Sequence, residues 1–312
     1  MKDKDARARS ASQRVSNRAR ERGLSRNDAL TAYTMDRLLY RLGRSAHVRE
    51  FFLKGGVLVA NLVTAPHRFT RDIDLLRRHG PPNPEEMRRR FRDVALVQVD
   101  DGLRFEPEHV RATLATRDTE GYDGVRVVMR AHLGDTEVPI QIDIGFGDAL
   151  EPPAERRRLA SFLDDDPPAE IYAYETGPVL AEKIETLLAK FPAIEHRLKD
   201  LLDVVVLARQ ERFEGDALVA SLRATFTRRE TAADVTVLEE LLAGLRGRKW
   251  TLGWAVMHRE KAVAVPTELV HALVLFEAFV RPLVAALAGG VTPGTWEPGG
   301  PWAATRYPGA RS

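Results

Sequence analysis

The sequence predicts an α+β protein with two lobes, in which a small mixed β-sheet precedes a lobe made of helices. Between residues 51 and 174, short apolar segments of strand length are separated by turn residues. From residue 176 onward, apolar residues recur mainly at helical spacing. A segment rich in proline, arginine and aspartate, residues 151–168, lies between these regions, and we expect it to form a hinge on the surface.

The composition indicates a soluble protein of a reducing compartment. The chain has 312 residues, 44% of them hydrophobic, which is enough for one large or two modest domains. Cysteine is absent, which excludes disulfides and thiolate metal sites. No uncharged apolar run reaches the roughly 18 residues of a membrane span, and the charged N-terminus lacks the apolar core of a signal peptide. We therefore expect a cytoplasmic protein that has no contact with a membrane.

Residues 1–48 are predicted to form a basic arm and a helix that packs on the sheet. Residues 1–23 are polar and rich in arginine. They form either a solvated, partly disordered arm that ends in a helix, or an electrostatic contact with an RNA backbone. Residues 25–45 carry apolar side chains at helical spacing, and Ser25 with Asp28 suits the start of a helix.

The chain is organised around a diglycine that is followed by two aspartates. Gly55-Gly56 precedes an apolar segment of helical length, after which Asp72 and Asp74 flank Ile73. In a strand, the two aspartates would point to one face while Ile73 enters the core. Two carboxylates this close repel each other unless a cation lies between them, and Mg²⁺ suits carboxylates combined with substrate phosphates. Taken alone, an Asp-x-Asp pair is also common on solvated strand edges, and a diglycine is usually a turn.

A third acid occurs later in the region of the predicted sheet. Asp143 is the single acid in the apolar strand of residues 138–144. Burial of an unpaired carboxylate is costly, so a metal ion or another cation is needed nearby. The alternative is an exposed strand face on which Asp143 lies opposite a lysine or arginine.

The segments between these motifs are predicted to form, in order, a loop (77–84), a helix (84–94), a strand with a turn (103–110), a hairpin turn (111–123) and a strand (125–133).

The diglycine and the aspartates belong to a longer pattern that resembles a known signature. Leu53-Lys54-Gly55-Gly56, followed by Arg-Phe-Thr-Arg-Asp-Ile-Asp-Leu at residues 68–75, is similar to the DNA polymerase β-like nucleotidyltransferase superfamily and, within it, to the AbiEii-type toxins, which include MenT-type enzymes that modify tRNA. The resemblance implies a catalytic domain over residues 49–170, with Mg²⁺, or Mn²⁺ in its place, and an NTP as co-substrate. It implies metal ligation by Asp72, Asp74 and Asp143. It also implies nucleotide contacts from Lys54, Gly55, Gly56, Thr70 and Arg71.

The helical region carries a second set of candidate residues. Lys183 shares a face with apolar neighbours in the predicted helix of residues 176–188, so it either extends to solvent or points at a bound triphosphate. Lys199, Asp200 and Asp203 have spacings that suit one face of the next helix. They form either an ordinary surface ion pair or part of a nucleotide site, and the apolar neighbours of Asp203 favour its partial burial. The resemblance implies that Lys183 and Asp203 are catalytic, and that Lys183, Lys199 and Asp200 contact the nucleotide.

Residues 171–290 are predicted to form a helical domain, and residues 291–312 an extended tail docked on the surface. The last helix is expected to bend near Pro282. After residue 213 we expect only helices, at 215–226, 234–245 and 266–287. Three side chains are expected between helices, where they either stack on bases or, as is commoner, form part of the core: Trp250, Trp254 and His258.

Together these features predict a metal-dependent nucleotidyltransferase that transfers NMP from an NTP to a hydroxyl group. The resemblance implies a toxin of a bacterial toxin–antitoxin system, with the 3′ end of tRNA as the acceptor, a block of translation as the result, and a cognate antitoxin as a partner. Two alternatives stay open. One is a transferase that modifies a small molecule, such as an aminoglycoside, or a protein hydroxyl. The other is a non-catalytic binding module on the same fold.

Overall fold

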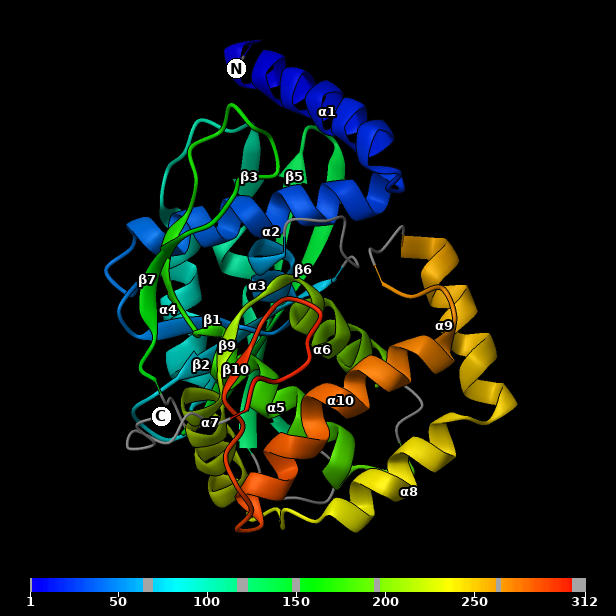
Figure 1. Ribbon diagram of the computed structural model, residues 1–312. Helices are drawn as coiled ribbons and strands as arrows, with labels where there is room; N and C mark the ends of the chain where they lie inside the picture. The colour runs from blue at the N-terminus through cyan, green and yellow to red at the C-terminus, as the bar shows by residue number, and fades with distance from the viewer. Residues whose placement is uncertain are drawn as a thin grey trace, which may run out of the picture. The chain divides into compact units, whose positions relative to one another are not determined.

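The structure is a computed structural model, which describes residues 2–63, 70–116, 123–147, 152–193, 197–261 and 265–304 (Figure 1). Residues 64–69, which include Arg68 and Phe69 of the predicted signature, and part of the predicted hairpin turn, 117–122, lie outside the described residues. The chain divides into two compact units, of which the first contains Met1–Asn61, Phe69–Asp148 and Ala154–Tyr174. The second contains Leu62–Arg68, Ala149–Pro153 and Glu175–Ser312.

An eight-stranded mixed sheet forms the centre of the first unit, which confirms the predicted α+β class. Its strands follow the order β3-β5-β6-β2-β1-β8-β7, and β4 also pairs with β5. The pairs β2–β6 and β1–β8 are parallel, and the other pairs are antiparallel. The strands are β1 (Phe51–Lys54), β2 (Asp72–Arg77), β3 (Leu103–Phe105), β4 (Arg111–Thr116), β5 (Asp123–Leu133), β6 (Thr136–Phe146), β7 (Glu155–Arg158) and β8 (Glu170–Ala173).

Two edge strands of this sheet were not predicted as strands. The residues of β4 were assigned to a hairpin turn, but all six of them pair with β5. The residues of β7 lie within the segment expected to be a surface hinge, and they pair with β8. Edge strands pair on one side only and can keep polar side chains in solvent. The residues of β7 are all charged, and the apolar residues of β4 are two alanines and one exposed leucine, so neither segment carries a strong apolar signal for a strand.

Helices of the first unit cover the sheet. Their bounds are α1 (Lys2–Arg22), α2 (Arg26–Arg44), α3 (Gly55–Leu62) and α4 (Pro84–Leu96), with a 3₁₀ turn at Pro107–His109. Helix α2 is the one predicted from residues 25–45. The side chain of Ser25 accepts a hydrogen bond from the backbone N–H of Asp28, and one face of the helix is buried, including Tyr33, Leu38 and Leu42. Helices α2 and α4 pack against strands of the sheet (Figure 1).

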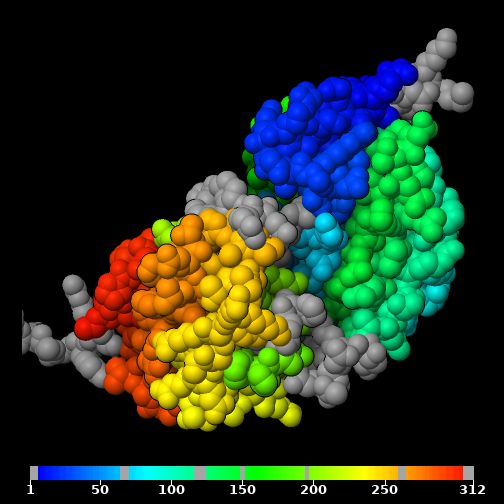
Figure 2. Space-filling view, turned by 90° about the vertical axis from the view of Figure 1, so that its right-hand side faces the viewer, coloured from blue at the N-terminus to red at the C-terminus, as the bar shows by residue number. Residues whose placement is uncertain are grey.

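The N-terminal helix α1 is not the solvated arm that the composition suggested. It is continuous from Lys2 to Arg22, and one side of it is buried. In Figure 2 the blue surface of α1 and α2 adjoins the green surface of the sheet. The buried stripe consists of small residues at the three- and four-residue spacing of one helix face: Ala8, Ala11, Val15 and Ala19. Alanine adds little apolar signal, and for this reason the arginines dominated the prediction.

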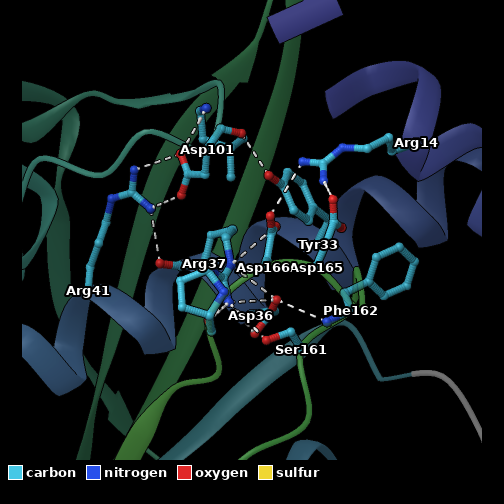
Figure 3. Close-up of polar contacts among 12 residues, drawn as sticks. Arg14, Tyr33, Asp36, Arg37, Arg41, Asp101, Ser161, Phe162, Asp165 and Asp166 are labelled. Carbon is cyan, nitrogen blue, oxygen red and sulfur yellow. Dashed lines mark hydrogen bonds and ion pairs between the residues drawn. The ribbon is translucent and has the colours of Figure 1, made fainter. Parts of the chain in front are cut away.

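Ion pairs join α1 to the segment between β7 and β8 (Figure 3). Arg14 pairs with Asp165 and, at 3.4 Å, with Asp166, while Arg18 pairs with Asp164. Exposed pairs of this kind each contribute about 0–1 kcal/mol, so the buried stripe supplies more of the docking energy. These two arginines, which the sequence offered as a contact for RNA, are therefore paired with carboxylates of the same chain.

A buried ion pair joins α2 to the start of β3 (Figure 3). The Arg41 guanidinium donates to both carboxylate oxygens of Asp101, at 2.6 and 3.0 Å, and each side chain is 3% exposed. Asp101 also accepts from the backbone N–H of Leu103, and its carbonyl oxygen accepts from the Tyr33 hydroxyl. Burial raises the pKa of the Tyr33 hydroxyl, which therefore stays protonated as a donor. This network fixes α2 relative to β3.

The Arg41→Ala variant is expected to lower the free energy of unfolding of the first unit by about 3–5 kcal/mol, because the Asp101 carboxylate would stay buried without its counter-ion. The control is Arg44→Ala, which removes an exposed arginine from the same helix and is expected to cost less than about 1 kcal/mol. Urea denaturation followed by far-UV circular dichroism measures both variants. Equal losses of stability would contradict the role given to Arg41.

The second unit is mainly helical, as expected for the C-terminal half. A short antiparallel ribbon joins Phe213–Glu214 (β9) to Thr295–Trp296 (β10), so the region after residue 213 is not purely helical as predicted. The helices, which gather around α10 in Figure 1, are α5 (Thr176–Ala189), α6 (Leu198–Gln210), α7 (Gly215–Arg228), α8 (Val235–Leu245), α9 (Arg248–Lys261) and α10 (Leu269–Leu287).

Helix α9 contains the aromatic residues that were expected between helices. Trp254 is 1% exposed and donates its indole N–H to the carbonyl of Pro266, and Trp250 is also buried. His258 lies in the same helix, 3.3 Å from the carbonyl oxygen of Val265. Both tryptophans therefore lie in the core, which was the commoner of the two alternatives, rather than being placed to stack on bases. The helix was missed because lysine, arginine and glycine interrupt its apolar spacing.

Residues 291–304 of the predicted tail contribute to the core of the second unit, and residues 305–312 lie outside the described residues. Trp296 is fully buried and donates its indole N–H to a carbonyl of α6 at 2.6 Å. Trp302 stacks on Phe279 of α10, with the ring centroids 5.4 Å apart, and donates to the carbonyl of the same residue. Large aromatic side chains dominate core energetics where they are buried. These tryptophans are therefore packed into the core of this unit, whereas the sequence predicted a tail docked on its surface.

Helix α10 is the central helix of that core. Among the described helices it alone is long and apolar enough to cross a membrane by length and composition, and half of its apolar window is buried inside the protein. A buried helix of a soluble domain has the same composition. Pro282 lies within it, at the position where a bend was expected.

Candidate active site

Three acids singled out from the sequence converge on one face of the sheet. Strands β2 and β6 are parallel, with Asp74 directly opposite Asp143 and Asp72 opposite Gln141. One carboxylate oxygen of each aspartate lies within 4.8 Å of the corresponding oxygens of the other two. All three aspartates are partly exposed, whereas Ile73 is buried in the core. The arrangement brings three negative charges together at a place that solvent can reach.

Gly55 makes room for one of these carboxylates. It begins α3 directly after β1, with a φ of +67°, which is a left-handed conformation that favours glycine. A Cβ at this position would lie 2.0 Å from Oδ2 of Asp74 and 2.6 Å from its Cβ. The sequence suggested that the diglycine makes room for a phosphate, and the structure adds that Gly55 makes room for Asp74. Gly56 is buried in the first turn of α3.

Basic residues flank the acids in a row that crosses four strands. Arg126 in β5 lies opposite Asp143, Asp143 lies opposite Asp74, and Asp74 lies opposite Lys54 in β1. Arg126 donates from Nε to Oδ1 of Asp143 at 2.8 Å and from Nη2 to Oδ2 at 3.2 Å. Gln141 also donates to Oδ2, at 3.0 Å. The hydrogen bond with Asp143 raises the pKa of the Arg126 guanidinium, which therefore stays charged.

The sequence interpretation missed Arg126 and Gln141. It left open an arginine opposite Asp143 on an exposed face, as an alternative to convergence of the acids, and the structure has both features together. The turn between β5 and β6 could have identified this arginine. Gly134-Asp135 forms a two-residue hairpin loop that pairs Leu133 with Thr136, and counting back along both strands from that pair places residue 126 opposite residue 143.

The other candidate residues of the first unit differ in their environments. The Thr70 hydroxyl donates to Oδ1 of Asp72 at 2.7 Å, so it orients one of the acids. Lys54 is nearly buried, and its Nζ lies 5.6 Å from the centroid of the Tyr174 ring. Arg71 donates to Asp28 of α2 at 3.1 Å, and its side chain is 79% exposed. Thr70 is therefore in contact with the acidic cluster, whereas most of the Arg71 side chain lies in solvent.

The candidate residues of the second unit form a buried ion cluster. Nζ of Lys183 in α5 lies 3.0 Å from Oδ1 of Asp200 and 2.6 Å from Oδ2 of Asp203, both in α6. No side chain of the three is more than 9% exposed. Lys183 thus does not extend to solvent, which was one of the two alternatives, and its contact with a triphosphate stays a prediction.

Lys199 is separate from this cluster. It is exposed, whereas Asp200 and Asp203, which the spacing grouped with it on one face, are buried against α5. The alternative that these residues form an ordinary surface ion pair is therefore wrong, because Asp203 is fully buried and pairs with Lys183. The apolar neighbours of Asp203 predicted its burial correctly.

The Lys183→Ala variant is expected to destabilise the second unit by about 3–5 kcal/mol, because two carboxylates would stay buried without their shared cation. The control is Lys199→Ala on the exposed side of α6, which is expected to change stability by less than about 0.5 kcal/mol. All four tryptophans lie between residues 250 and 302, so urea unfolding followed by tryptophan fluorescence reports on this unit. If both variants unfolded at the same urea concentration, the cluster would not be a stabilising element.

Comparison with known families identifies the class of this protein. The family model described as nucleotidyl transferase AbiEii toxin, type IV toxin–antitoxin system, matches residues 37–279. The chain belongs to the AbiEii nucleotidyltransferase toxin family. The match includes the acidic cluster of the first unit and the ion cluster of the second. It confirms the resemblance found in the signature, and it identifies this chain as a nucleotidyltransferase rather than a non-catalytic binding module.

One solved structure supports this assignment at the level of the fold. MenT4, a nucleotidyltransferase toxin from Mycobacterium tuberculosis H37Rv, is 16% identical to this chain; the match covers 88% of this chain and 89% of the MenT4 chain, with a TM-score of 0.54. JHP933 from Helicobacter pylori is also 16% identical, covering 83% of this chain and 90% of that one, but its TM-score is only 0.41. A comparison with curated proteins finds no match.

Proposed function

We propose that this protein transfers a nucleoside monophosphate from an NTP to a hydroxyl group at the 3′ end of tRNA, with a divalent metal ion bound by Asp72, Asp74 and Asp143. The observation that carries the chemistry is the convergence of the three carboxylates beside Gly55. Transfer to tRNA would remove the free 3′ hydroxyl that aminoacylation needs, and this loss would block translation.

The donor set suits Mg²⁺, or Mn²⁺ in its place. Both are hard cations that prefer oxygen ligands, and the three aspartates offer carboxylate oxygens within 4.8 Å of one another. Without a cation, three like charges at this distance repel one another. Metal ions bound here would supply charge neutralisation at the entering and leaving oxygens of phosphoryl transfer.

The chain's own groups hold and orient this site. The Thr70 hydroxyl keeps one oxygen of Asp72 in place, and Gly55 lets the Asp74 carboxylate approach the turn before α3. The remaining assignments come from the family pattern. The residues proposed to line the triphosphate are Lys54, Gly55, Gly56, Thr70 and Arg71. Lys183 is proposed to neutralise charge on the leaving pyrophosphate. Lys199 and Asp200 are proposed to contact the nucleotide, and Asp203 to act as a catalytic acid.

The biological partners follow from the family. Membership of a type IV toxin–antitoxin family implies an antitoxin partner. tRNA as the acceptor rests on the resemblance to MenT-type enzymes, and we place the reaction in the cytoplasm, where tRNA is charged and used.

An incorporation assay tests the proposal directly. The purified protein is incubated with total tRNA and each of the four α-³²P-labelled NTPs in turn, with Mg²⁺ and with EDTA. We expect label in tRNA from at least one NTP, equimolar pyrophosphate release, and loss of both with EDTA. Pyrophosphate release without labelled tRNA would overturn the acceptor but not the chemistry. Labelling that persists in EDTA would overturn the metal site.

A further inference from the structure

The ion pair between Arg126 and Asp143 places a guanidinium on a proposed metal ligand. Nε and Nη2 of Arg126 donate to different oxygens of Asp143, and Gln141 donates to one of them as well. Both carboxylate oxygens are therefore already hydrogen-bonded. The strand register places Arg126 and Asp74 on opposite sides of Asp143, because β5 and β2 pair with opposite edges of β6.

A divalent cation at the three acids would lie close to this guanidinium. The two positive charges repel each other, and they compete for the same carboxylate. Asp72, by contrast, accepts its hydrogen bond from the neutral hydroxyl of Thr70. The repulsion is removed if Arg126 moves, or if an anion joins the cluster.

Arg126 is able to move to an anion. Its side chain is 47% exposed, and it extends from β5, which lies between β6 and the edge strands β3 and β4. A guanidinium binds phosphate oxygens with the same planar fork of donors that it uses for a carboxylate. The triphosphate of an NTP is the anion that the proposed reaction brings to this cluster.

We propose that Arg126 is a positioning residue that couples the binding of metal to the binding of nucleotide. It pairs with Asp143 while the site is empty of nucleotide, and it transfers to a phosphate when an NTP binds, which frees Asp143 as a ligand. This inference rests on the proposed function, because it takes the three acids as metal ligands and a triphosphate as the incoming anion. The result is a site that binds metal and nucleotide together in preference to metal alone.

The test compares Arg126→Gln with Arg130→Gln. Arg130 lies on the same strand and the same face, is 50% exposed, and pairs with Glu137 at 3.6 Å rather than with an acid of the cluster. Both variants lose one positive charge from the same face of β5, so only the contact with Asp143 distinguishes them. Binding of Mn²⁺ is measured by electron paramagnetic resonance without nucleotide. Binding of a fluorescent, non-hydrolysable NTP analogue is then measured at saturating Mn²⁺.

The two measurements are expected to move in opposite directions in Arg126→Gln. Without nucleotide, Mn²⁺ should bind about 10-fold more tightly than in the parent, because a repelling charge is gone. At saturating Mn²⁺ the NTP analogue should bind about 10-fold more weakly, because a phosphate contact is gone. Arg130→Gln should stay within about twofold of the parent in both. A merely structural role for Arg126 would weaken both kinds of binding.

Unchanged or weaker Mn²⁺ binding in Arg126→Gln would overturn the coupling. The variant Asp143→Asn separates this outcome from failure of the proposed function. If Mn²⁺ binds the parent and is lost in Asp143→Asn, the metal site stands whatever Arg126 does. If Mn²⁺ binding is absent from the parent or insensitive to Asp143→Asn, the metal site and the coupling both fall.

Discussion

Replacing Asp72 with alanine is expected to reduce nucleotidyl transfer by at least about 10³-fold, since it removes one of the three carboxylates that converge on the sheet. It also leaves the Thr70 hydroxyl without the oxygen to which it donates. The loss should fall on the rate of the chemical step, because the metal-binding acids act on charge that develops as the phosphoryl group is transferred. The incorporation assay with labelled NTP and tRNA measures this rate.

The stability of Asp72→Ala separates lost chemistry from lost folding. Three carboxylates close together destabilise the metal-free protein, so removing one should leave the thermal midpoint unchanged or slightly higher. Adding Mg²⁺ should raise the midpoint of the parent and not that of the variant. The control Asp135→Asn, which neutralises an exposed acid in the turn between β5 and β6, should keep parental activity. An Asp72→Ala variant that transfers label as fast as the parent would remove these acids from the mechanism.

Replacing Gly55 with alanine is expected to reduce transfer by about 10²-fold or more, although every proposed metal ligand would still be present. The added Cβ would lie 2.0 Å from Oδ2 of Asp74 and 2.6 Å from its Cβ. Rotation of the carboxylate cannot relieve a contact with the Cβ of Asp74. Strand β2 would have to move away from the turn between β1 and α3, which would carry Asp74 out of the cluster.

A matched glycine isolates this contact from simple backbone strain. Gly134, in the turn between β5 and β6, has a φ of +60°, close to the +67° of Gly55, but a Cβ there would meet no atom within 4 Å. Gly134→Ala should cost about 1–2 kcal/mol of stability and leave the transfer rate unchanged. Equal activity in the two variants would show that Gly55 serves only the backbone conformation of its turn.

The sequence was most informative where residue type and local period both point to one structure. Asp72, Ile73 and Asp74 alternate as a half-buried strand must, and Ser25 with Asp28 marks the start of α2 at the residue where the helix begins. The apolar neighbours of Asp203 likewise predicted its burial. In each case a short-range rule decides the outcome, without knowledge of a distant partner.

The sequence was least informative where a distant partner decides. Arg14 and Arg18 read as a solvated basic arm because their aspartates follow about 150 residues later in the chain. Lys183 has two acidic partners in another helix, so helical period alone left open whether it extends to solvent or points at a bound triphosphate. Strand β4 pairs along all its length with β5, but its apolar residues are only two alanines and one exposed leucine. In all three cases, contacts with residues distant in the sequence determine the structure, and the local sequence of one segment does not reveal such contacts.

The docking of α1 and of residues 291–304 has a consequence for how the protein is made on the ribosome. Helix α1 is synthesised before its aspartate partners, which for Arg14 emerge 151 residues later; at about 5–20 residues per second this is a delay of roughly 8–30 s. The second unit must likewise wait for Trp296 and Trp302 before its interior is closed. A nascent chain therefore cannot acquire its finished shape progressively from the first residue. A premature stop codon before Trp302 would leave aromatic surface of α10 open to water, and such truncated products become targets for cellular proteases.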